Sequence, residues 1–130
     1  MRGWIAGGLL GLGLIAAGAA SAQTVNIAGT WRIAGQIVVG NVFVSATPVC
    51  NFKQVGSRLS GACIGPNASG PITGVVSGRA VSWTWSNRAT TRIGLNGLTG
   101  FNGTYENSRL IRGTMTSSAS PGRGTFTQTR

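Results

Sequence analysis

The sequence predicts an all-β protein, an antiparallel up-and-down barrel of about eight strands that carries one disulfide within a hairpin. Short segments with apolar residues at alternate positions recur after residue 22, separated by Gly, Asn, Pro and Ser. No apolar run in this region recurs at the helical spacing of three and four residues. A meander of short strands protects its edges best by closing into a barrel.

The expected strands follow one another with short connections. They cover residues 29–39, 42–54, 58–64, 71–77, 80–87, 93–105 (broken near Asn96-Gly97), 108–117 and 122–129. Alternation assigns their faces: Val81, Trp83 and Trp85 share one side of their strand and are expected to point inward.

Two cysteines are predicted to form a disulfide across one hairpin. Gly56-Ser57 has the composition of a two-residue turn with Gly in the first position. Pairing about that turn places residue 55 opposite 58 and Cys50 opposite Cys63, at a separation that a disulfide can span. The alternative is a pair of reactive thiols, which an oxidising compartment disfavours.

Residues 1–22 have the pattern of a Sec-type signal peptide. A basic start is followed by an apolar run and by Ala20-Ser21-Ala22, which predicts cleavage between Ala22 and Gln23. The alternative is a membrane anchor that stays uncleaved. With cleavage, residues 23–130 form a single domain without a transmembrane segment, located in the periplasm or secreted.

The residue inventory argues against an enzyme. The chain contains no His, and its only acidic residue is Glu106. Acid–base pairs, catalytic triads and metal sites need side chains that are missing here, so we expect no cofactor and no metal. Lys53 remains as a lone nucleophile, but alternation places it on the outer face. Glu106 is expected to pair loosely with Arg109 or Arg112.

The second strong signal is positive charge. The formal net charge is +10, and ten of the eleven basic residues follow residue 22. Such a protein attracts anionic polymers, including lipopolysaccharide, polysaccharide and DNA. The best candidates for an anion-binding cluster are the Arg residues of loops and turns: Arg58, Arg79, Arg88, Arg92 and Arg123. Alternatively, the scattered charges only keep a Gly-rich barrel soluble.

Aromatic side chains provide the candidates for a ligand pocket. An eight-stranded barrel either fills its interior with side chains or holds one small ligand. The residues concerned are Trp31, Phe52, Trp83, Trp85 and Tyr105. Packing in a filled core is the alternative interpretation for most of them.

Several short motifs resemble the calycin superfamily, and within it avidin and streptavidin. They are Gly29-Thr30-Trp31, Leu59-Ser60-Gly61, Val81-Ser82-Trp83-Thr84-Trp85 and Gly124-Thr125-Phe126-Thr127. The resemblance covers most of residues 23–130 and implies an eight-stranded barrel with a ligand mouth at one end. The chain is also similar to small exported Gram-negative proteins that combine a Gly-x-Trp start with a Cys-linked hairpin.

Biotin binding does not follow from this resemblance. The family has an Asn where this chain has Ile33, and a carboxylate where this chain has Arg123 or Gly124. No Trp between residues 108 and 120 matches the one that the neighbouring subunit supplies in that family. We therefore expect a barrel without the biotin chemistry.

Two functions are compatible with these features. The first is a non-enzymatic binding protein that holds a small apolar or amphipathic ligand in the barrel. The alternative is a basic envelope-associated protein with a filled barrel, which docks on anionic polymers or on a protein partner. The sequence specifies neither the ligand nor the oligomeric state.

Overall fold

The protein is described from a computed structural model covering residues 23–94, 96–118 and 122–130. The predicted signal peptide lies outside these residues. The strands are β2 (Gly29–Val39), β3 (Val42–Ala46), β4 (Val49–Val55), β5 (Arg58–Ile64), β6 (Ala68–Ser77), β7 (Ala80–Ala89), β8 (Gly97–Asn107), β9 (Leu110–Ser117) and β10 (Gly122–Thr129).

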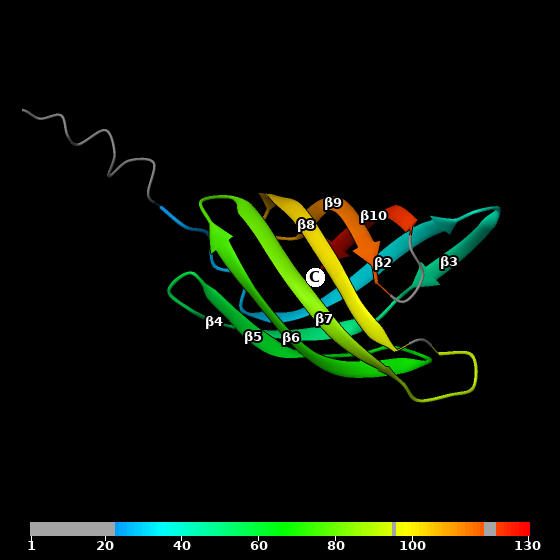
Figure 1. Cartoon of the computed structure of the whole chain (residues 1–130). Coiled ribbons are helices and arrows are strands. Elements are labelled where there is room, and N and C mark those ends of the chain that lie inside the picture. The colour runs from blue at the N-terminus through cyan, green and yellow to red at the C-terminus, as the bar shows by residue number, and fades with distance from the viewer. Residues whose placement is uncertain (1–22, 95, 119–121) are drawn as a thin grey trace, which may run out of the picture.

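The strands form one closed antiparallel barrel (Figure 1). Neighbours in sequence pair along the sheet, and β10 closes it by pairing with β2. β3 and β4 occupy one position in the barrel, because both pair with the same side of β2, one after the other. The barrel is therefore eight-stranded and up-and-down, as predicted.

The predicted strand 42–54 is divided at Thr47-Pro48. Proline has no N–H to donate to a ladder, so pairing stops there. Pro48 is buried, and its carbonyl accepts the Ile33 N–H at 3.0 Å, which keeps the two halves beside β2. The other differences are at strand ends: β4 ends at Val55, β6 begins at Ala68, β7 ends at Ala89, β8 spans Gly97–Asn107 and β9 begins at Leu110.

The β4–β5 hairpin confirms the predicted register and disulfide. Cys50 is paired with Cys63, and Val55 with Arg58. The two sulfurs are bonded, with Cα atoms 4.0 Å apart, and both side chains are fully buried.

Aromatic rings fill the centre of the barrel. The Trp83 ring stacks on Phe101 with ring centroids 3.9 Å apart. Phe52 meets Trp83 edge-on, and Phe126 meets Phe101 in the same way. All four side chains are buried, so this part of the interior is a packed core.

One end of the barrel, which we call the closed end, is covered by the segment before β2. Ile27 is fully buried there, and its N–H donates to Gln54 Oε1 at 2.8 Å. The Trp31 indole N–H donates to the Ile27 carbonyl at 2.8 Å. The Arg130 guanidinium lies 4.2 Å from the centre of the Trp31 ring and donates to the Ala28 carbonyl.

The turns divide between this closed end and the opposite, open end. In an up-and-down barrel successive connections alternate between the two ends, as Figure 1 shows. The closed end has the turns of β4–β5, β6–β7 and β8–β9. The open end has the connections of β2–β3, β5–β6, β7–β8 and β9–β10, the third and fourth of which include residues that are not described.

Candidate ligand-binding site

The five aromatic residues predicted to line a pocket have three different environments. Trp31 lies under the segment that covers the closed end, and Phe52 and Trp83 belong to the packed centre. Tyr105 is half-buried at the closed end, with the Arg79 guanidinium 5.3 Å from its ring centre. Trp85 lies nearest the open end.

Trp85 lines a cavity of about 140 Å³ inside the open end. Its lining residues come from β2, β3, β6, β7, β8 and β9 and from the connecting segments 47–48, 65–67 and 93–94. The apolar side chains among the lining residues include Ile37, Pro48, Ala68, Ile93 and Met115. Ile93 is 78% exposed, so it belongs to the rim rather than to the floor.

Two buried polar side chains share the cavity wall with Trp85. Asn87 follows Trp85 by two positions on β7, and Thr99 is the cross-strand partner of Trp85 on β8. The Thr99 hydroxyl donates to Asn87 Oδ1 at 2.9 Å. The cavity lining therefore includes one buried, hydrogen-bonded pair of polar side chains beside Trp85.

The indole N–H of Trp85 has no hydrogen-bond partner among the described residues. Trp85 is only 5% exposed, so its N–H is largely removed from bulk solvent. A buried donor without a partner costs about 1–3 kcal/mol, and an acceptor on a ligand would recover this. Gln128 Nε2 is likewise without a partner in the described part of the chain, but Gln128 does not line this cavity.

The size of the cavity limits what can enter it. A dry, apolar protein cavity of about 150 Å³ accommodates one benzene molecule. The cavity at the open end is close to that size, so it fits one six-membered ring or a short branched chain. A longer ligand would extend past Ile93 into solvent.

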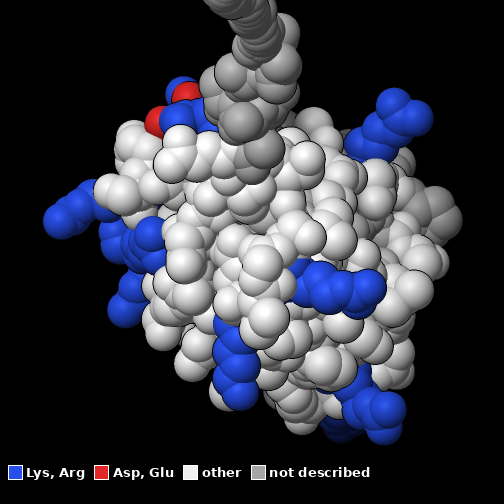
Figure 2. Space-filling view, turned by 90° about the vertical axis from the view of Figure 1, so that its left-hand side faces the viewer, with Lys and Arg blue, Asp and Glu red and all other residues white. Residues whose placement is uncertain are grey.

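The predicted cluster of Arg residues is divided between the two ends. Arg58 and Arg79 belong to closed-end turns, whereas Arg88, Arg92 and Arg123 lie at the open end. Figure 2 shows basic side chains spread over the face in view, without a single cluster. Glu106 is 3.6 Å from Arg112, and both side chains are exposed, so this pair contributes little stability.

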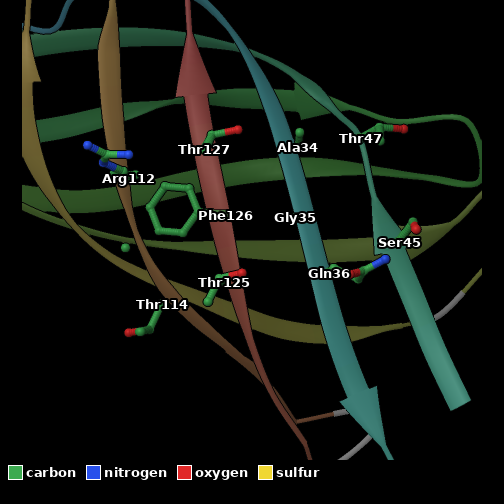
Figure 3. A pocket seen from close by; sticks show the side chains of 11 residues that line it. Ala34, Gly35, Gln36, Ser45, Thr47, Arg112, Thr114, Thr125, Phe126 and Thr127 are labelled. Carbon is green, nitrogen blue, oxygen red and sulfur yellow. The ribbon is translucent and has the colours of Figure 1, made fainter.

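A second depression lies on the outer wall of the barrel, over β2, β3, β9 and β10 (Figure 3). It is a shallow groove of about 680 Å³, lined mainly by outward-facing Thr, Ser, Gln and Ala side chains with Arg112 at one side. Its polar side chains are exposed, and the Phe126 ring behind them belongs to the core. The groove lacks the buried polar groups that the cavity has.

Sequence reasoning identified Trp85 but missed the residues that make its cavity. Asn87 continues the inward series of Val81, Trp83 and Trp85, so the alternation itself would have indicated it. Thr99 precedes the buried Phe101 by two positions on β8, so the same alternation would have indicated it as well.

No group of three metal-ligating side chains (His, Cys, Asp or Glu) occurs within residues 23–94, 96–118 and 122–130. In the same residues, no helix is long and apolar enough to cross a membrane. No family model matches the chain, and no curated protein matches it in sequence. By fold, the protein is a closed eight-stranded antiparallel barrel with a hairpin disulfide.

Proposed function

We propose that this protein is a non-enzymatic binding protein that holds a small amphipathic ligand at the open end of its barrel. The ligand places a ring or short branched chain in the cavity and accepts a hydrogen bond from the Trp85 indole. The observation that carries this proposal is the unpartnered indole N–H beside an apolar cavity of about 140 Å³.

Export and calycin-like ancestry are part of the proposal. The pattern of residues 1–22 supports a cleaved signal peptide and a periplasmic or secreted location. The Cys50–Cys63 disulfide is in keeping with an oxidising compartment. The closed eight-stranded barrel is the architecture that the resemblance to calycins implies.

The absence of catalysis rests on the residue inventory. With no His and a single acidic residue, the chain lacks the pairs of groups that general acid–base chemistry uses. Glu106, its one carboxylate, is exposed and lies beside Arg112, away from the cavity.

Two probes of similar shape test the site. Acetophenone carries a carbonyl acceptor, and ethylbenzene has a methylene group in its place. We expect acetophenone to bind more tightly, and we expect Trp85→Phe to weaken its binding about tenfold, because one hydrogen bond to a buried donor is lost. Binding of ethylbenzene should change less than threefold. Isothermal titration calorimetry measures both.

Tyr105→Phe provides the matched control, since it removes a polar group from an aromatic side chain at the closed end. This variant should bind both probes as the unaltered protein does. The proposed site would be refuted if neither probe binds, or if Trp85→Phe weakens the two probes equally.

A further inference from the structure

The open end of the barrel carries most of the exposed apolar side chains. Nine large hydrophobic side chains are exposed in the described residues. Six of these lie at the open end, in or beside the connections that surround the mouth: Val38, Val42, Phe43, Ile64, Ile93 and Leu98. Exposed apolar groups gathered in one region mark a contact with a protein or a membrane.

The β2–β3 hairpin presents the most prominent of them. Phe43 is 66% exposed and Val42 is 60% exposed. Phe43 is paired across the hairpin with Val38, which is also exposed, so the two side chains share one face. Figure 1 shows this hairpin extending from the body of the barrel.

Cations accompany these apolar side chains. Arg88 is on β7 near the mouth, Arg92 is in the β7–β8 connection, and Arg123 is paired with Val38. All three are exposed. The one acidic residue of the chain, Glu106, is near the β8–β9 turn at the closed end. We call the six apolar residues and these three Arg residues the rim.

We propose that the rim docks the barrel, mouth first, on an anionic phospholipid surface. Guanidinium groups form paired hydrogen bonds to phosphate, and apolar side chains beside them can enter the headgroup boundary. Charge complementarity selects this partner, because the described rim carries three cations and no anion. Docking in this orientation places the cavity entrance against the lipid, which supplies amphipathic molecules to the proposed site.

Vesicle co-sedimentation tests the docking. Vesicles contain phosphatidylcholine alone or with about one third phosphatidylglycerol. We expect binding to the anionic vesicles only, falling as salt is raised. Each cation at such a surface contributes roughly a fivefold gain in partitioning, so Arg88→Gln/Arg92→Gln should lower it about 25-fold. Val42→Thr/Phe43→Thr should lower it at least tenfold through lost apolar contact.

Matched variants at the closed end show whether vesicle binding depends on the rim or only on the total positive charge and exposed apolar surface of the protein. Arg58→Gln/Arg109→Gln removes two exposed cations, and Val55→Thr/Val75→Thr alters two exposed apolar side chains. Both should keep vesicle binding within about threefold. The eight positions altered in these four double variants are all exposed, so we expect each variant to fold. Thermal unfolding checks this.

Vesicle docking and ligand binding in the cavity are measured separately, so either proposal can be refuted without the other. The proposal is overturned if anionic vesicles do not bind, or if the closed-end variants lose as much binding as the rim variants. It is also overturned if the protein binds heparin or DNA in the same buffer but not the vesicles. Val42 and Phe43 do not line the cavity, so acetophenone binding without vesicles reports on the proposed function alone.

Discussion

The three indole N–H groups of the described chain lie at different depths in the barrel and differ in their partners. The Trp31 N–H donates to the Ile27 carbonyl at the closed end. The Trp83 N–H donates to Gln128 Oε1 at 3.2 Å inside the aromatic core. The Trp85 N–H has no partner in the described residues. Buried Trp residues normally satisfy this donor, so Trp85 differs from the other two in having an N–H that the proposed ligand could use.

Arg130 is the residue whose removal should most clearly loosen the closed end. Its guanidinium covers the Trp31 ring and donates to the Ala28 and Ser108 carbonyls. We expect Arg130→Ala to lower the free energy of unfolding by about 1–2 kcal/mol, through lost cation–π and hydrogen-bond contacts. Urea denaturation measures this loss of unfolding free energy, and Arg109→Ala, at an exposed position, is the control. Equal effects of the two variants would show that Arg130 has no special structural role.

At the scale of the element, the β4–β5 hairpin depends on two glycines for different reasons. Gly56 is in the turn with φ +62°, and a side chain there would meet no atom within 4 Å. Gly61 has φ +141°, and a Cβ there would collide with the Asn51 carbonyl of the neighbouring strand. The first position needs only a left-handed backbone, whereas the second needs the absence of a side chain.

Substituting the two glycines should therefore give unequal losses of stability. We expect Gly61→Ala to cost about 2–4 kcal/mol, from backbone strain and overpacking together. Gly56→Asn should cost less than about 1 kcal/mol, because Asn tolerates the left-handed region. Thermal or urea unfolding of the oxidised protein gives both values. Similar costs at both positions would contradict this explanation of Gly61.

Local patterns predicted the elements well. The alternation at Val81, Trp83 and Trp85 and the Gly56-Ser57 turn are contained in a few neighbouring residues, and both match the structure. The interruption at Pro48 was missed, although a proline within an apparent strand is itself a local signal. The division of the Arg residues between two ends also follows from the alternation of turns in an up-and-down barrel.

The cavity could not be predicted in the same way. Whether an inward aromatic residue lies in the packed centre or near the mouth depends on strand tilt and on the stagger around the barrel. Trp83 and Trp85 are two positions apart with the same alternation, yet Trp83 stacks on Phe101 and Trp85 borders the cavity. Only the pairing of all the strands determines that difference.

At the scale of the whole molecule, the two ends of the barrel differ in construction. The closed end is sealed by Ile27, Trp31 and Arg130 through short-range contacts. The open end retains a small cavity, with exposed apolar side chains and Arg residues around it. This asymmetry is what connects the proposed ligand site to the proposed docking surface.

The most direct test of the central claim is an NMR titration that follows the indole ¹H–¹⁵N signals with acetophenone. Signals are assigned with single Trp→Phe variants. We predict that the Trp85 signal shifts progressively and saturates, moving downfield as its N–H gains an acceptor, whereas the Trp31 and Trp83 signals stay nearly fixed. A Trp85 signal that does not move while probe is bound, or larger shifts at Trp31 or Trp83, would contradict ligand binding at the open end.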